Sequence, residues 1–372
     1  MKHPNDNGFH VDYAAEIYAA MLEENIPSDG VTVEGRSDGE PGPAVPIDET
    51  RNVATGEEKP LDNVAPQRIA VPTLSVTPAS PSLGDTPLAR ELSELTRRRQ
   101  ALAAATLPLP PKTRVLTVAN QKGGVGKTTT TVNLAAALAH SGARVLVIDL
   151  DPQGNASTAL GVDHRSDTVS VYEVIINDEL VASVIQKSPD FDTLFCVPAT
   201  IHLAGAEIEL VSMVARENRL RTALEKFLDE SEELFHYVFI DCPPSLGLLT
   251  INAFVAAQEV LIPIQCEYYA LEGLSQLLTN IKLIERHLNP VLVVSTILLT
   301  MYDGRTNLAN QVAQDVRDHF PDQVLTTLIP RSVRISEAPS YGQTVISYDA
   351  NSSGSLSYLE AAAEIARRGA PQ

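Results

Sequence analysis

The stretch NQKGGVGKTTT, residues 120–130, joins the apolar run RVLTVAN (114–120) to an Ala/Leu-rich segment at 127–140. A buried strand, a glycine-rich loop and a helix in this order are the setting of a phosphate-binding loop. Glycines let successive backbone N–H groups point at one anion, and the start of the helix adds its positive end. The stretch therefore predicts a nucleotide site on an α/β sheet.

The loop departs from the usual pattern G-x-x-x-x-G-K-[ST] in one respect. Gly126, Lys127 and Thr128 supply its second half, but Gln121 stands where the first glycine is usual. Lys122 adds a lysine that the pattern does not require. We expect Lys127 to bridge the β- and γ-phosphates and the Thr128 hydroxyl to ligate Mg²⁺. The phosphate-loop pattern does not by itself explain the role of Lys122.

The rest of the chain after residue 112 alternates between apolar, β-branched runs and helical segments. We expect strands at 114–120, 144–150, 237–244, 259–265 and 291–300. We expect helices at 127–140, 204–210, 213–229, 246–256, 270–287, 307–319 and 355–368. This order predicts an α/β fold with a doubly wound, mostly parallel sheet and helices on both faces.

Residues 1–112 differ in composition from the rest of the 372-residue chain. They hold 14 of the 25 prolines, and the first 67 residues carry 14 acidic against 4 basic side chains. We therefore expect a mostly disordered N-terminal extension, with short helices at 9–24 and 87–105, before one globular domain at 113–372. These helices are interpreted as nascent structure, because short isolated helices are marginal. The alternative is that they dock a partner.

Net charge and cysteine content exclude some classes of protein. The net charge is −19, so any contact with DNA needs a local basic patch that overcomes an unfavourable overall field. Cys196, Cys242 and Cys266 are odd in number and lack C-x-x-C spacing, which argues against disulfides, zinc or an iron–sulfur cluster and fits a reducing cytoplasm. No apolar run approaches 18 residues and no signal peptide is evident, so we expect a cytoplasmic protein without a membrane span.

Three aspartates follow or end predicted strands. Asp241 ends the apolar run Tyr237–Ile240 and Asp149 ends a neighbouring run. In an open α/β sheet the carboxyl ends of strands meet at the ligand site, so both carboxylates are candidate Mg²⁺ ligands. Asp151 lies two residues further on, in a loop that can carry it to the water facing the γ-phosphate. Each aspartate alone has the alternative interpretation of a helix cap or turn residue.

Four motifs in order along the chain identify a resemblance. KGGVGKTTT (122–130), DLDPQGNAS (149–157), DCPPSLG (241–247) and IPRSVRISEAPSYG (329–342) resemble the ParA/Soj family of chromosome- and plasmid-partitioning ATPases. This is the deviant Walker-A group of P-loop NTPases, which also includes MinD and the nitrogenase iron protein. The resemblance runs from about residue 113 to the C-terminus and leaves out the N-terminal arm.

The resemblance implies ATP and Mg²⁺ as cofactors and a homodimer in the ATP state. It implies that Lys122 reaches across the dimer to the partner's phosphates, that Asp151 positions the attacking water, and that Asp149 and Asp241 serve the metal together with Thr128. The alternative for Lys122 is a solvent-exposed neighbour that contributes only local potential. The implied nucleotide-binding residues are Lys122, Gly123, Gly124, Val125, Gly126, Lys127, Thr128, Thr129 and Pro330, the last at the adenine. The implied catalytic residues are Lys122, Lys127 and Asp151.

The resemblance also implies that the ATP-bound dimer binds double-stranded DNA without sequence preference, in the nucleoid. Arg305 and Arg334 match the family's DNA-contacting arginines, with Arg331 nearby, and a guanidinium pairs with phosphate oxygens whatever the base. The alternative is that these arginines are local salt-bridge partners of residues such as Asp303 and Glu337. The resemblance further implies a ParB-like centromere-binding protein that stimulates slow hydrolysis. A polar scaffold protein that binds the N-terminal arm is a separate hypothesis, because the resemblance does not cover that arm.

Three other functions remain as alternatives. A MinD-like ATPase acting on a membrane would need a C-terminal amphipathic helix with a basic rim, but residues 355–372 are Ala-rich and predict a helix that packs on the core. An iron-protein role would need cluster-binding cysteines between subunits, and Cys242 is better interpreted as a small buried residue. A scaffold with vestigial hydrolysis is disfavoured by the intact Lys127, Thr128, Asp151 and Asp241.

Overall fold

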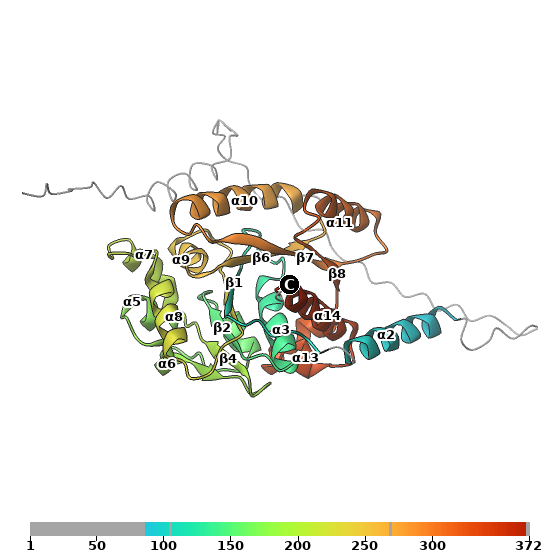
Figure 1. Ribbon diagram of the computed structural model, residues 1–372, viewed down its shortest axis with the longest axis horizontal. Coiled ribbons are helices and arrows are strands. Elements are labelled where there is room, and N and C mark those ends of the chain that lie inside the picture. The colour runs from blue at the N-terminus through green and yellow to red at the C-terminus, as the bar shows by residue number, and fades with distance from the viewer. Residues whose placement is uncertain (1–85, 104–105, 268–269, 370–372) are drawn as a thin grey trace, which may run out of the picture. The chain divides into compact units, whose positions relative to one another are not determined.

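One eight-stranded sheet organises the computed structural model of the chain, with the strands in the order β3-β4-β2-β5-β1-β6-β7-β8 (Figure 1). The structure describes residues 86–103, 106–267 and 270–369. The strands are β1 (Arg114–Val118), β2 (Val145–Asp149), β3 (Gln186–Lys187), β4 (Leu194–Val197), β5 (Tyr237–Asp241), β6 (Glu259–Gln265), β7 (Val293–Tyr302) and β8 (Val324–Pro330). Only the β3–β4 pair in this sheet is antiparallel. The predicted mostly parallel α/β fold is confirmed.

Helices cover both faces of the sheet (Figure 1). On one face lie α3 (Lys127–His140), α4 (Asn155–Ala159), α12 (Val333–Glu337), the 3₁₀ helix η2 (Ala338–Tyr341), α13 (Val345–Tyr348) and α14 (Ser353–Arg368). On the other lie α5 (Val171–Ile176), α6 (Val181–Val184), α7 (Leu203–Leu210), α8 (Arg219–Glu230), α9 (Leu248–Ala256), α10 (Ala270–His287) and α11 (Asn307–His319). The helix α2 (Pro87–Ala103) precedes β1.

The strand residues divide between two hydrophobic cores. In β1, Val115 belongs to the core under α5 to α11, whereas Leu116 belongs to the core under α3 and α14. In β5, Val238 belongs to the core under α5 to α11 and Phe239 to the core under α3 and α14. Both faces of the central strands are buried, which explains why their sequences are continuous apolar runs rather than alternating ones.

The strand register brings the predicted site to one edge of the sheet. Asp241 at the end of β5 lies opposite Val118 of β1 on one side and opposite Asp149 of β2 on the other. The glycine loop leaves β1 at the same edge. Parallel pairing alone therefore sets the two aspartates next to the loop.

Most predicted elements are found within a few residues of their expected positions, whereas one helix begins late and several short elements, including α4, α5, α6, α12 and α13, were not predicted. The short strands β3 and β4 and the edge strand β8 were not predicted, because β3 has two residues and β8 carries two threonines in its middle. The helix expected at 213–229 begins only at Arg219, after Ala215 adopts a left-handed φ of 51° that an α-helix does not accept. The helix expected at 9–24 lies outside the described residues.

The helix α2 corresponds to the expected helix at 87–105 and is attached to α14. Arg98 donates to both carboxylate oxygens of Glu360, with Nε 2.8 Å from Oε1, and Arg99 donates to the carbonyl of Asn351. From Glu91 onward the described residues form one compact unit. The domain boundary at 112/113 remains a prediction.

The C-terminal helix α14 packs on the core, as its sequence predicted. Ala361, Ala362 and Ile365 are buried, and the helix contacts α3 and β8. Its apolar face is therefore occupied by protein. Across the described parts of the chain, no helix is both long enough and apolar enough to cross a membrane.

Candidate nucleotide-binding site

The phosphate loop is held open by two glycines and one asparagine. Gly124 and Gly126 adopt left-handed φ values of 75° and 88°, which are costly for residues with a Cβ. The buried Asn120 donates to the carbonyl of Pro263 at 2.9 Å and accepts the Lys122 N–H at 3.0 Å. Asn120 thus ties the loop to the end of β6. Sequence reasoning missed this role, although an asparagine at a strand end is a common turn residue.

The loop leads directly into α3. Gly126 occupies the N-cap position and no side chain caps the helix there. A Cβ built on Gly123 or Gly124 would meet nothing within 4 Å, so the space above the loop is open. Uncapped N–H groups at a helix start, facing open space, form an anion site. The predicted phosphate-binding residues from Lys122 to Thr128 are therefore brought together.

Lys127 is buried at the beginning of α3. Its ammonium lies 3.4 Å from the carbonyl of Lys122, and no carboxylate of the described residues lies within ion-pair distance of it. Burial lowers the pKa of Lys127, while the negative charges of Asp241 and Asp151 act in the opposite direction. A buried cation without a direct counter-ion is costly. A phosphate group in the open space would offset that cost.

Asp241 accepts hydrogen bonds from two threonines of α3. Thr128 Oγ1 donates to Oδ2 at 2.7 Å and Thr131 Oγ1 donates to Oδ1 at 2.9 Å. Burial and the neighbouring charge of Asp149 raise the pKa of Asp241 to about 8, and the two hydroxyls only partly counteract this. A buried carboxylate beside a hydroxyl is a suitable donor set for Mg²⁺, whose charge would favour the ionised form. Thr131 was missed in the sequence, although its spacing of three from Thr128 places both on one helix face.

Asp149 lies beside Asp241 but is engaged with its own loop. Its Oδ2 accepts from the Ser157 N–H at 2.9 Å and the Ser157 hydroxyl at 2.7 Å, and its Oδ1 accepts from the Asp151 N–H at 3.1 Å. Burial raises the pKa of Asp149 to about 6. In this arrangement Asp149 orders the segment after β2. The role of Asp149 as a Mg²⁺ ligand stays a prediction.

Asp151 lies in a short turn between β2 and α4. Its carbonyl accepts the Gly154 N–H at 2.9 Å, and its Oδ1 accepts the Gln153 N–H at 3.0 Å. Gly154 takes a left-handed φ of 62° and begins α4. The carboxylate of Asp151 is half-buried and close enough to Lys127 to influence its pKa. The predicted water-positioning residue therefore lies near the phosphate loop.

Lys122 points to the side of the loop in this single chain. Its Nζ lies 2.7 Å from Oε2 of Glu267, just after β6. The two side chains remain 42% and 48% exposed, so the ion pair is screened by water. The structure thus gives the extra lysine a partner within its own chain. Its predicted reach to a second chain stays a prediction.

The predicted adenine and DNA residues lie around the ends of β7 and β8. Pro330 ends β8 opposite Tyr302 of β7 and lines a groove of about 860 Å³ beside α2 and α14. Exposed Arg305 pairs with Asp303 at 2.7 Å, and exposed Arg334 pairs with Glu337 at 3.1 Å and Asp349 at 3.4 Å. The local salt bridges considered from the sequence are therefore formed in the free chain.

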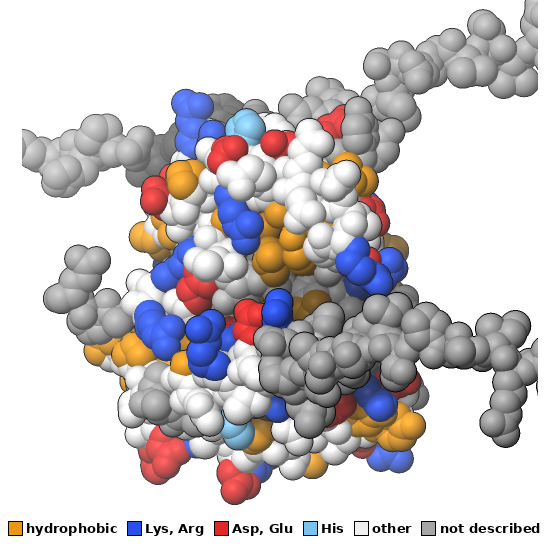
Figure 2. Space-filling model, turned by 90° about the vertical axis from the view of Figure 1, so that its right-hand side faces the viewer, with side chains coloured by type: hydrophobic (Ala, Val, Ile, Leu, Met, Phe, Trp, Pro, Cys, Tyr) orange, Lys and Arg blue, Asp and Glu red, His pale blue; other side chains and the backbone are white. Residues whose placement is uncertain are grey.

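The third arginine belongs to the same neighbourhood. The backbone N–H of the exposed Arg331 donates to the carbonyl of Tyr302. The hydrogen bonds from Arg305 lower the pKa of Asp303, and the charge of Arg331 adds a smaller effect in the same direction. Figure 2 shows the side of the molecule that carries the C-terminal helices, where Lys and Arg side chains lie among hydrophobic ones. Among the described side chains in that view, the basic ones are scattered rather than continuous.

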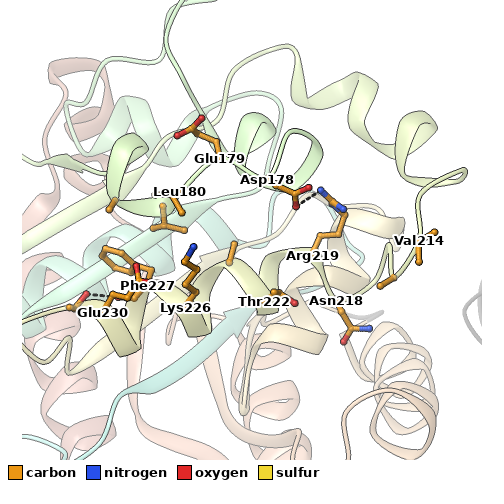
Figure 3. A pocket seen from close by; sticks show the side chains of 15 residues that line it. Asp178, Glu179, Leu180, Val214, Asn218, Arg219, Thr222, Lys226, Phe227 and Glu230 are labelled. Carbon is orange, nitrogen blue, oxygen red and sulfur yellow. Dashed lines mark hydrogen bonds and ion pairs between the residues drawn. The ribbon is translucent and has the colours of Figure 1, made fainter.

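A separate cavity lies away from the phosphate loop. It measures about 620 Å³ and separates residues 178–182 from α8 (Figure 3). Leu180 and Phe227 face each other across it, and the Arg219–Asp178 ion pair of 2.5 Å lies at its other end. None of the predicted site residues lines this cavity. It is therefore not the nucleotide site.

Several known proteins are similar to this chain over about two thirds of its length. Residues 113–294 match the AAA domain family. The chain is 52% identical over 256 residues to the sporulation initiation inhibitor protein Soj of Bacillus subtilis. The matched region covers 69% of this chain and 99% of that protein. It is also 50% identical over 259 residues to the chromosome partitioning protein ParA of Myxococcus xanthus. This matched region covers 70% of this chain and 90% of that protein.

Two solved structures share the fold over the same part of the chain. Cobyrinic acid a,c-diamide synthase of Mycobacterium smegmatis with bound ADP and magnesium has a TM-score of 0.58 at 40% identity, over 67% of this chain and 92% of that one. The cell division ATPase MinD of Pyrococcus furiosus has a TM-score of 0.56 at 26% identity, over 68% of this chain and 98% of that one. Both matches leave about a third of this chain uncovered.

Proposed function

Because this chain belongs to the Soj/ParA family of chromosome-partitioning proteins, we propose that it is an ATPase whose ATP-bound homodimer binds DNA. Hydrolysis, slow in the isolated protein and stimulated by a ParB-like centromere-binding partner, would release it from DNA. The cycle would segregate chromosome or plasmid origins in the cytoplasm, on the nucleoid.

One observation carries this proposal. An open glycine loop, a buried lysine without a direct counter-ion and a hydroxyl–carboxylate pair lie at one edge of a parallel sheet. This set fits ATP and Mg²⁺: the loop and Lys127 would hold the phosphates, and Thr128 and Asp241 would hold the metal, with Asp149 alongside. Mg²⁺, when bound, neutralises charge on the phosphate oxygens.

Individual residues of the chain would have separate roles at the bound nucleotide. Lys127 would supply a positive charge that is itself buried, and such a charge interacts more strongly with a phosphate than one at the surface does. Asp151 would orient a water molecule from the turn after β2. Lys122 would leave Glu267 and approach the phosphates bound to the second chain, so that the dimer forms only around the triphosphate.

DNA binding would use Arg305, Arg331 and Arg334. Two of these arginines already hold carboxylates in exposed pairs, which cost little to break. Phosphate oxygens would replace those carboxylates without reading base identity. Dimerisation would double the number of arginines on one DNA and make affinity depend on the nucleotide state and on salt.

The MinD-like alternative receives no support from the C-terminal helix. The apolar residues of α14 are buried against α3 and β8, so that helix has no free apolar face to place on a membrane. A MinD-like protein acting on a protein scaffold would still share the nucleotide chemistry. DNA binding by the ATP state separates that alternative from the proposed function.

The test is the oligomeric state with a non-hydrolysable ATP analogue and with ADP, measured by sedimentation, together with DNA binding. We expect a dimer and DNA binding with the analogue only. Lys122→Ala should still bind nucleotide but should lose the dimer by at least tenfold in affinity, which is about 1.4 kcal/mol. Glu267→Ala is the matched control, because it removes the ion pair and keeps the lysine. A Lys122→Ala dimer of normal stability contradicts the cross-chain role.

A further inference from the structure

The helix α7 carries an apolar row on its outer face. Ile201, Ile208 and Val211 are 61%, 79% and 60% exposed, and Ala204 between them is also exposed. Ala204 and Ile208 lie on one side of α7, Ile201 lies in the turn before the helix and Val211 is its C-cap, and the spacing of three, four and three residues keeps them in one row. Val214, 89% exposed, continues the row into the next turn. We call these five residues the α7 face.

The helix α7 itself is packed firmly on the core. Leu203, Ala206 and Leu210, on the opposite side of α7, are completely buried in the core. Single exposed apolar residues are ordinary on protein surfaces, whereas a row of large ones on a fixed helix marks an interaction site. Residues 201–214 contain no Lys or Arg, so the surface does not suit a nucleic acid.

A chain of bonds ties the start of α7 to the end of β2. The Ser157 hydroxyl donates to Asp149 at 2.7 Å and accepts the Ala199 N–H at 3.1 Å. The carbonyl of the next residue, Thr200, accepts the N–H of Leu203 at 3.0 Å, which begins the helix. The position of α7 therefore depends on the carboxylate beside the predicted metal site.

A second tie joins α7 to the segment that follows Asp241. The helix α7 packs against α9, and burial raises the pKa of the half-buried Glu207, an effect that the backbone N–H of Leu249 at the start of α9 partly counteracts. The Glu207 carboxylate lies so close to Gly247 that a Cβ there would be 1.8 Å from its Oε1. That oxygen is buried and has no hydrogen-bond partner among the described residues. The helix α7 thus contacts both segments that follow the aspartate pair.

We propose that the α7 face packs against a second copy of this chain in the ATP-bound dimer, an inference that rests on the proposed function. A twofold dimer sets identical patches close together, so an uncharged apolar patch suits it better than any charged surface. The net charge of −19 makes two copies repel, and the five residues of the α7 face add no charge of their own, although the exposed Glu209 lies beside Ile208. Its two ties to the aspartate pair bring it to the edge of the sheet where the nucleotides would meet.

The first experiment compares two charge insertions in the full chain. Ile208→Glu should weaken the dimer formed with the ATP analogue by at least tenfold, while binding of a fluorescent ATP analogue by the monomer stays unchanged. Val291→Glu is the matched control, because Val291 is 64% exposed but precedes β7 at the opposite edge of the sheet. It should dimerise like the parent.

The second experiment avoids a disruptive substitution. The three native cysteines are buried, so Ile208→Cys introduces one accessible thiol and Val291→Cys another at the control position. We expect a maleimide to label Ile208→Cys at least fivefold more slowly with the ATP analogue than with ADP. The Val291→Cys protein should label equally in both states.

The outcomes separate this inference from the proposed function. If the parent chain stays monomeric with the ATP analogue, the proposed function fails and the inference with it. If the parent dimerises and Ile208→Glu dimerises equally well with no protection of Ile208→Cys, the inference alone is overturned. It is also overturned if Ile208→Glu dimerises normally but no longer responds to a ParB-like protein, because the α7 face then belongs to that partner.

Discussion

Replacing Asp241 by asparagine should stabilise the nucleotide-free protein while removing its response to Mg²⁺–ATP. Asp241 is fully buried, and burial with the neighbouring Asp149 raises its pKa to about 8, from an ordinary value near 3.8. The asparagine side chain would keep the shape and could still hydrogen-bond both threonine hydroxyls, since a hydroxyl donates as well as accepts. The substitution therefore removes the titratable proton with little change in packing.

The size of the effect follows from the two pKa values. An acid whose pKa is raised on folding stabilises the protein fully below its unfolded pKa, and this contribution is lost as pH rises toward the folded pKa. Each pH unit in that window is worth about 1.4 kcal/mol, so the window from about 4 to about 8 corresponds to on the order of 5 kcal/mol. Between pH 5 and pH 8 the parent should lose about 4 kcal/mol through Asp241. Asp149, raised to about 6, adds a smaller loss at lower pH.

Equilibrium unfolding in urea at pH 5, 6.5 and 8, without nucleotide, measures this dependence. Asp241→Asn should show a shallower decline with pH than the parent and should be at least 2 kcal/mol more stable at pH 8. Mg²⁺–ATP should raise the stability of the parent and leave the variant unchanged. Asp229→Asn, at an exposed position on α8, is the control and should follow the parent. Equal slopes for Asp241→Asn and the parent would refute the buried-carboxylate reasoning.

Two further substitutions test the chemistry and the DNA surface. Asp151→Ala should slow hydrolysis by about 100-fold or more, as expected for a lost base or water-positioning group, and should hold the ATP dimer on DNA; rapid phosphate release by this variant contradicts the assignment. Arg334→Glu should weaken DNA binding of the ATP-analogue dimer at least tenfold and reduce its dependence on salt, without changing dimerisation. Arg221→Glu, on α8, is its control, and unchanged DNA affinity of Arg334→Glu places the DNA elsewhere.

The sequence was sufficient for the fold because its central strands are unambiguous. Both faces of β1, β2 and β5 are buried, so each is an unbroken apolar run between recognisable turns. The edge strands were missed for the opposite reason. The strand β8 exposes part of one side and carries Thr326 and Thr327, whose backbone N–H groups are both bound by Glu364 of α14. A side chain from a distant helix that completes an edge strand leaves no local pattern.

The residues of the candidate site could be predicted from the sequence, but the hydrogen bonds that connect them could not. The glycines, Lys127, Thr128 and the two strand-end aspartates form local motifs whose chemistry is specific, and the sheet register places them together. The roles of Asn120, Ser157 and Thr131 depend on partners 143, 42 and 110 residues away. Hydrogen bonds over such separations exist only once the strands have paired, so single-sequence reasoning has no access to them.

The ion pair of Lys122 with Glu267 must break before Lys122 can take part in the proposed dimer. Both side chains are more than 40% exposed, so breaking the pair costs less than about 1 kcal/mol. Two triphosphates brought face to face concentrate far more negative charge than one exposed carboxylate does. The lysine should therefore move to the phosphates whenever a second loaded chain approaches, while in the ADP state the single carboxylate suffices to hold it. In the proposed dimer, the γ-phosphate would therefore decide whether Lys122 pairs with Glu267 or with the phosphates of the second chain.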